Sequence, residues 1–215
     1  MVWPLGQTFE HVFLPQLEEL SLACDDWVEP RAIPQCRVPS LRHLAITKLE
    51  AGVDDGIVSI INTLYSQLDS LTFDIRDLEQ LRPQIPHLSY SNVLLDIFSG
   101  SLGSEDTQAF ELHQSEIRHV RLQHSFVGAE MHDQIDLDRF IEFIACAPPS
   151  LALSTVYISS DHSQLEENAH TSKSRLIETC RRRNIQVVEE KIPEVSTWDT
   201  FISPGFVRKM SSRKL

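Results

Sequence analysis

A short hydrophobic pattern recurs along the chain and predicts a series of strands. In its first copy Leu14, Leu17, Leu20 and Leu22 are apolar, so the successive spacings are three, three and two residues. A spacing of two is that of an extended strand, in which alternate side chains point to the same face. Further copies occupy 38–46, 68–73 and 117–122. Each copy therefore predicts an extended approach that ends in a short strand.

The predicted strands alternate with helical segments. The strands are expected at Glu19–Ala23, His43–Thr47, Ser70–Asp74, Val93–Ile97, His119–Gln123, Leu151–Ile158 and Ile185–Glu189. Apolar residues at i, i+3, i+4 and i+7 indicate amphipathic helices between some of these strands. This spacing occurs in 57–64 and 137–144, and a further helix is expected to bury Leu176, Ile177 and Cys180.

Three positions are suited to capping the predicted helices. Asp136 is expected to cap the helix over 137–144, because its carboxylate can accept the unpaired amide hydrogens of the first turn. Thr171 or Ser172 is expected to cap the helix that contains Leu176. Asn184 is expected to end that helix in the left-handed conformation.

The middle inward residues of the first six strands are regularly spaced, and we call them the inward row. They are Leu20, Leu44, Leu71, Leu95, Val120 and Val156, with gaps of 24, 27, 24, 25 and 36 residues. The first four gaps lie within the roughly 20–29-residue period of leucine-rich repeats. One strand with its return segment cannot bury its own apolar side, whereas stacked copies can.

This spacing predicts an α/β fold. We expect a leucine-rich-repeat-like solenoid with a parallel sheet on the concave face and helices or irregular segments on the convex face. The solenoid is expected to form a single domain over 1–192. A partly disordered C-terminal tail is expected over 193–215.

Three stretches carry a narrower resemblance. They are Leu14–Leu20, Val38–Leu44 and Leu176–Ile185. In them the chain resembles the C-terminal repeat region of fungal F-box proteins with degenerate leucine-rich repeats. The resemblance implies that the repeats recognise a protein substrate, and in that family an F-box binds the Skp adaptor of a cullin ubiquitin ligase. The first repeat starts soon after Met1, so we expect no F-box here, and a Skp adaptor only if an F-box is encoded upstream.

Charge and composition narrow the class of partner. The net charge of −12 disfavours general nucleic-acid binding, which needs a basic face to neutralise phosphates. No segment has the character of a secretion signal or a membrane span. The four cysteines form no C-x-x-C pair, and we interpret Cys146 and Cys180 as buried apolar residues on helix stripes. The chain is therefore expected to be cytoplasmic or nuclear.

Two sets of polar residues have the types needed for chemistry but are better interpreted as surface segments. Asp161-His162-Ser163 has the residue types of a hydrolase triad. Three consecutive residues, however, cannot place the base between the nucleophile and the carboxylate. The segments 131–138 and 162–170 contain metal-ligand types without the spacing of a defined zinc site. We therefore expect no catalytic residue, no metal and no cofactor.

The remaining candidate site is the strand face that lies opposite the inward row, which we call the opposite face. Its predicted protein-binding residues are His43, Thr72, Asp74, Leu94, Asp96, Phe98, His119, Arg121 and Tyr157. Repeat solenoids bind partners on a broad, rigid concave surface, and aromatic and arginine side chains are common anchors at interfaces. These residues predict a non-enzymatic protein–protein interaction module, similar to the substrate-recognition region of an F-box ubiquitin-ligase subunit. The expected partner is a protein, with no nucleic acid and no membrane.

Two alternatives remain open. The first is a compact α/β enzyme of unknown reaction, whose catalytic groups converge from distant strands. His43, Asp74, Asp96 and His119 are the groups that could converge in this way. A deep pocket that holds two of them within hydrogen-bond reach would favour the enzyme, whereas an open curved sheet would favour the binding module. The second alternative is a truncated paralogue without a function.

Overall fold

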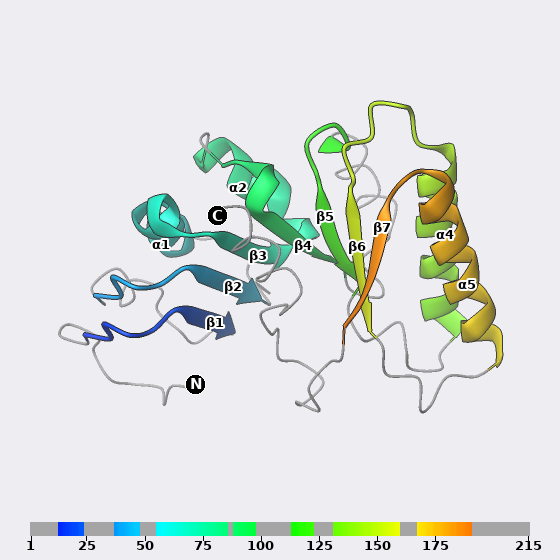
Figure 1. Cartoon of the computed structure of the whole chain (residues 1–215). Helices are drawn as coiled ribbons and strands as arrows, with labels where there is room; N and C mark the ends of the chain where they lie inside the picture. The colour runs from blue at the N-terminus through cyan, green and yellow to red at the C-terminus, as the bar shows by residue number, and fades with distance from the viewer. Residues whose placement is uncertain are drawn as a thin grey trace. The chain divides into compact units, whose positions relative to one another are not determined.

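The computed structural model describes residues 13–23, 37–47, 55–85, 88–97, 113–122, 131–159 and 167–190. These residues form an α/β protein with seven strands (Figure 1). They fall into two compact units, one up to Asn92 and one from Val93 onward. Within each unit every strand pairing is parallel, so the predicted α/β class and parallel pairing are confirmed. The solenoid and the single domain over 1–192 stay predictions.

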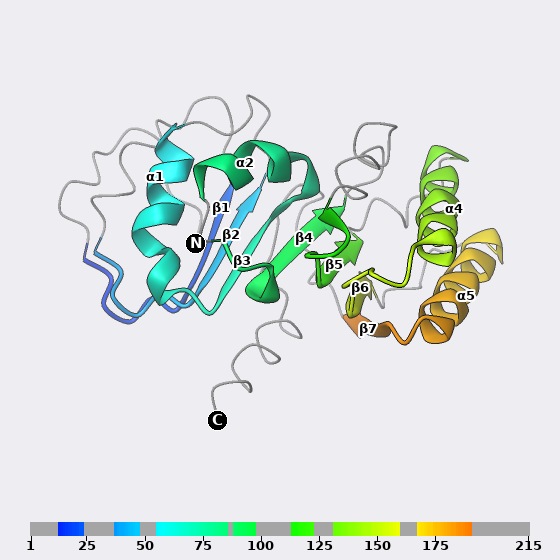
Figure 2. The same cartoon turned by 90° about the horizontal axis from the view of Figure 1, so that it is seen from above.

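The first unit contains three strands in chain order: β1 (Glu19–Ala23), β2 (His43–Thr47) and β3 (Ser70–Asp74). Its helices are α1 (Asp55–Leu64) and α2 (Leu78–Gln84), with short 3-10 turns η2 (Tyr65–Gln67), η3 (Ile75–Asp77) and η4 (Tyr90–Asn92). Figure 2 shows α1 and α2 over one face of the three strands. The register aligns Leu20 with Leu44 and Leu44 with Leu71, as the repeat predicts.

Backbone hydrogen bonds join the starts of the three strands in the same way. The amides of Arg42 and His43 both donate to the carbonyl of Glu18, at 2.8 and 3.0 Å. The amides of Asp69 and Ser70 donate to the carbonyl of Arg42, at 2.6 and 3.1 Å. This repeated contact satisfies the backbone where each copy enters its strand, and it explains why the copies keep a common register.

The second unit contains four strands in chain order: β4 (Val93–Ile97), β5 (His119–Leu122), β6 (Thr155–Ser159) and β7 (Gln186–Glu190). Its inward row continues through aligned neighbours, with Leu95 beside Val120, Val120 beside Val156 and Val156 beside Val187. Leu95, Val120 and Val156 are buried. The row forms a continuous apolar strip because parallel strands in register place equivalent residues side by side.

Two long helices, α4 (Met131–Cys146) and α5 (Glu167–Arg182), lie side by side in the second unit (Figures 1 and 2). An ion pair joins Arg175 Nη1 to Asp138 Oδ1 at 2.9 Å. Near the other end, Arg183 Nη2 donates to the carbonyls of Ala147 and Pro148, the latter at 3.0 Å. The second contact lies further along the chain than the first on both helices, so α4 and α5 run in the same direction.

The positions of the helix ends correct part of the sequence analysis. The helix α4 begins at Met131, so Asp136 lies inside it and is not its cap. The helix α5 begins at Glu167, so neither Thr171 nor Ser172 starts it. The apolar stripe marks only the buried length of a helix, and each helix extends beyond that stripe. Asn184 has φ 58°, which confirms the predicted left-handed end.

The burial of the two described cysteines also differs from the sequence prediction. Cys180 is buried as expected, but Cys146 is exposed. Cys146 follows the buried Ile144 by two residues, which at about 100° per residue turns it to the far side of the helix. The prediction for Cys146 was therefore wrong, because this residue does not belong to the buried stripe of α4.

Candidate functional site

The predicted protein-binding residues of the opposite face are buried. The exposed fraction is 6% or less for His43, Thr72, Asp74, Leu94, Asp96, His119, Arg121 and Tyr157. Phe98, the ninth predicted residue, lies outside the described residues. The expected accessibility of this face is therefore corrected, while its role in protein binding stays a prediction.

The burial follows from the parallel arrangement of the strands. Every residue of β3, β4 and β5 is buried, so neither face of these strands meets solvent. Parallel sheets are commonly covered on both faces, whereas alternation between a core face and a solvated face is typical of antiparallel sheets. Alternation along each strand predicted a solvated face, but such a face is typical of antiparallel strands, and these strands are parallel.

Asp96 and Arg121 form a buried ion pair on the opposite face. They are register neighbours on β4 and β5. Arg121 Nε donates to Asp96 Oδ1 at 2.8 Å, and Arg121 Nη2 donates to Asp96 Oδ2 at 2.7 Å. The exposed fractions of the two side chains are 3% and 0%. A bidentate, desolvated pair of this kind fixes the relative position of the two strands, because either charge alone would be costly to bury.

Other polar residues of the opposite face are also register neighbours on adjacent strands of the same unit. Tyr157 on β6 is the register neighbour of Arg121, and Thr155 is the register neighbour of His119. In the first unit His43 Nδ1 lies 2.7 Å from Ser70 Oγ, a buried hydrogen bond between register neighbours on β2 and β3. The structure therefore brings Asp96 together with Arg121 and His43 together with Ser70, in contacts that hold strands in register.

An exposed groove between α4 and α5 is a second candidate site, which the sequence analysis missed. Its volume is about 970 Å³. The residues that line this α4–α5 groove are Asp138, Ile141, Glu142 and Ala145 from α4, and Thr171, Ser174, Arg175, Glu178, Thr179 and Arg182 from α5. On each helix they follow the i, i+3, i+4 spacing of a single face.

The charges of the α4–α5 groove are of both signs and accessible. In the Arg175–Asp138 pair the side chains are 56% and 39% exposed. Arg182 pairs with Glu178 within α5 at 3.0 Å, and these side chains are 75% and 50% exposed. Exposed pairs are individually worth about 0–1 kcal/mol, so a partner can exchange them at low cost. The polar faces of the two predicted helices were the signal that could have located this groove.

The described thiols and metal-ligand types add no reactive centre to either candidate. Burial raises the pKa of the Cys180 thiol to about 11, so this thiol stays protonated and unreactive near neutral pH. Among the described side chains, no group of three or more His, Cys, Asp or Glu residues could hold a metal ion. Asp138, from one candidate metal segment, instead pairs with Arg175. Asp161-His162-Ser163 lies outside the described residues.

In the described part of the chain, every helix is too short or too polar to cross a membrane. Comparison of the chain with protein-family models, with curated proteins and with solved structures finds no match.

Proposed function

We propose that this protein is a non-enzymatic protein-interaction module whose partner binds in the α4–α5 groove. The observation that carries the proposal is the groove itself. It is open to solvent, has a volume of about 970 Å³, and is lined by charged residues of both signs from two parallel helices. The partner that fits it is a protein segment with a basic group for Glu142 and an acidic group for Arg175 or Arg182. Such complementary charges give specificity and orientation to a protein contact.

The contacts and positions of the candidate catalytic groups also support binding rather than catalysis. Asp96 is engaged by Arg121 and His43 by Ser70, each within hydrogen-bond distance. None of His43, Asp74, Asp96 and His119 lines the α4–α5 groove. The accessible chemistry of the groove is therefore that of recognition by charge and shape.

Within this proposal the chain plays the part of the substrate-recognition region of an F-box ubiquitin-ligase subunit. The support is the resemblance of its repeat copies, together with the register that aligns Leu20, Leu44 and Leu71. The bound partner is then the substrate protein. A Skp adaptor is a further partner only where an F-box precedes the repeats.

The test compares proteins captured from a cell extract by the tagged full chain and by two charge-reversal variants. Arg175→Glu reverses a charge in the α4–α5 groove, and Arg82→Glu makes the same change on the exposed surface of α2. Far-UV circular dichroism and the urea midpoint establish that both variants are folded. We expect a set of proteins that the wild type and Arg82→Glu retain and that Arg175→Glu loses.

A second arm uses Glu142→Lys, which changes the other helix of the groove. This variant is expected to lose the same proteins as Arg175→Glu, because both substitutions alter one surface. If all variants capture the same proteins as the wild type, the groove is not the binding site and the proposal fails. A turnover activity that depends on His43 or Asp96 would also overturn it.

A further inference from the structure

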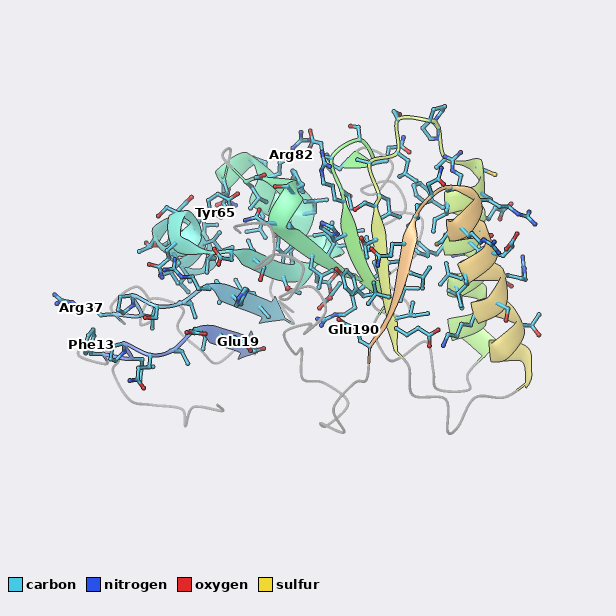
Figure 3. The ribbon with its side chains drawn as sticks, viewed as in Figure 1. Phe13, Glu19, Arg37, Tyr65, Arg82 and Glu190 are labelled. Atoms are coloured by element: carbon cyan, nitrogen blue, oxygen red, sulfur yellow. The ribbon has the colours of Figure 1, made fainter. Side chains whose placement is uncertain are left out.

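The first repeat copy is less well covered than the second at matched positions. Val38, Leu41 and Leu44 are 6%, 0% and 1% exposed. Their counterparts 24 residues earlier, Leu14, Leu17 and Leu20, are only half-buried. Phe13, which bridges to Arg37 at the start of the copy, is 60% exposed (Figure 3). The apolar residues of the first copy thus retain surface that their equivalents bury.

The backbone of β1 also has a side that pairs with none of the described strands. The carbonyl of Glu18 accepts from the amides of Arg42 and His43, so the peptide groups of Glu18 face β2. Backbone directions alternate along a strand, and the N–H and C=O of Glu19 therefore point away from β2. Among the described strands, β1 pairs with β2 alone. An edge of this kind can pair with an additional strand.

The charges at this edge define which strand would fit. Glu18 and Glu19 are both exposed, and Figure 3 shows Glu19 on β1. Like charges placed opposite each other across paired strands are destabilising. A second copy of this chain would place the same two glutamates near each other, and both copies carry a net charge of −12. The favoured occupant is a strand from a different protein with basic residues.

We infer that the edge of β1 binds an extended protein segment as an added parallel or antiparallel strand, with apolar and basic residues in alternation. The apolar residues cover Leu20 and the basic residues pair with Glu19, because successive side chains of a strand lie on opposite faces. Main-chain hydrogen bonds supply affinity in this mode of recognition, and alternate side chains supply specificity. This inference rests on the proposed protein-binding function, and it names a second surface, in the unit that does not contain the α4–α5 groove.

The probe is a fluorescent synthetic peptide of about nine alternating valine and lysine residues, a length within the usual range of strands. Its binding to the full chain is measured by fluorescence anisotropy at about 0.15 M salt, where charges more than about 8 Å apart are screened. A peptide of alternating valine and glutamate is the charge control. We expect the lysine peptide to bind and the glutamate peptide not to bind.

Substitutions at the edge test whether β1 is the binding site. Glu19→Pro removes an outward-facing amide together with the Glu19 carboxylate and keeps the bonds between β1 and β2, since proline is tolerated on an edge strand at such a position. It is expected to weaken binding about tenfold, the effect of losing one or two hydrogen bonds. Glu19→Lys is expected to weaken the lysine peptide similarly. Glu189→Lys makes the same charge change on β7 and is expected to leave binding unchanged.

A modified peptide tests the pairing without any change to the protein. Methylation of alternate backbone nitrogens of the lysine peptide keeps its charge and blocks pairing along one edge. It is expected to abolish binding when the methylated edge is the one that faces β1. Equal binding by the methylated and unmethylated peptides, whichever edge is methylated, would overturn the inference, and so would equal loss with Glu19→Lys and Glu189→Lys.

Two further outcomes identify a different occupant or a different site. Loss of peptide binding with Glu142→Lys but not with Glu19→Lys would place the peptide in the α4–α5 groove and overturn the inference. A dimer in sedimentation analysis that Glu19→Pro dissociates would show a second copy at the edge and also overturn it. If the peptide fails to bind while groove-dependent capture persists, only the edge inference fails. Failure of both assays removes the proposed function as well.

Discussion

The two units use different polar chemistry between neighbouring parallel strands. In the first unit a single hydrogen bond joins the His43 ring to the Ser70 hydroxyl at 2.7 Å. In the second unit Asp96 and Arg121 form a doubly hydrogen-bonded ion pair. Both contacts join register neighbours that are buried. Burial and register are therefore common to both contacts, whereas the type of contact and its place differ: His43 and Ser70 precede the inward row, and Asp96 and Arg121 follow it.

The ionic contact is expected to be the most sensitive to loss of one partner. Arg121→Met leaves the Asp96 carboxylate buried without this cation, and it is expected to lower the free energy of unfolding by about 3–5 kcal/mol. Urea unfolding followed by circular dichroism measures the change. The double variant Asp96→Leu/Arg121→Met is expected to recover most of the loss, because an apolar pair can replace a buried ion pair. A single variant as stable as the wild type would contradict the burial of this pair.

The inward row of the first unit offers a comparison between a fully and a partly covered leucine. Leu71→Ala is expected to cost about 2–5 kcal/mol, since Leu71 is 0% exposed and the substitution leaves a cavity. Leu20→Ala is expected to cost clearly less, because Leu20 is only half-buried. The same urea titration compares the two variants. Equal losses would mean that β1 is covered as fully as β3 in solution.

The second unit is expected to lose stability at alkaline pH through Cys180. Burial raises the pKa of this thiol from 9.0 to about 11, so the folded state holds a proton that the unfolded state releases first. The contribution of the protonated Cys180 thiol to the free energy of unfolding is fully present below pH 9. It is lost as pH rises from 9 through 11, by at most about 3 kcal/mol at 1.36 kcal/mol per pKa unit.

The measurement for Cys180 is the urea midpoint between about pH 8 and 11, a range that spans the ordinary thiol pKa. Cys180→Ala is expected to show a smaller decrease with pH than the wild type. Cys146→Ala, at the exposed cysteine of α4, is expected to follow the wild-type curve. Identical slopes for Cys180→Ala and the wild type would show that the thiol does not contribute.

The hydrogen bond between His43 and Ser70 is expected to give the smallest effect. Ser70→Ala removes an uncharged hydroxyl that bonds to His43, so the expected cost is about 1–2 kcal/mol. Ser66→Ala changes an exposed serine in the same unit and is expected to be neutral. A loss from Ser70→Ala as large as that from Arg121→Met would remove the distinction between the two units.

Strand positions and register could be predicted from the sequence because they depend on a local period. The alignment of Leu95 with Val120 already places Asp96 beside Arg121, one residue further along both strands. The pair was nevertheless interpreted as part of an open surface. Whether a strand face is covered depends on segments distant in the chain, and periodicity along one strand carries no information about them.

The polar faces of α4 and α5 could be recognised in the sequence, but their assembly into the α4–α5 groove could not, for a related reason. Asp138 and Arg175 lie 37 residues apart, and their contact depends on how two helices pack. The early starts of α4 and α5 at Met131 and Glu167 also escaped prediction, because polar first turns have no apolar stripe. For Cys146 the error was to predict burial that the structure does not have. Cysteine is often buried, but this one lies on the exposed side of its helix.

The bond from Arg183 to the end of α4 has a consequence for synthesis on the ribosome. The carbonyl of Ala147 receives its donor from a residue translated 36 positions later. A nascent chain that ends before Arg183 therefore presents the last turn of α4 without this donor. Closure of this contact therefore has to wait until Arg183 has left the exit tunnel, and β7 emerges only after it.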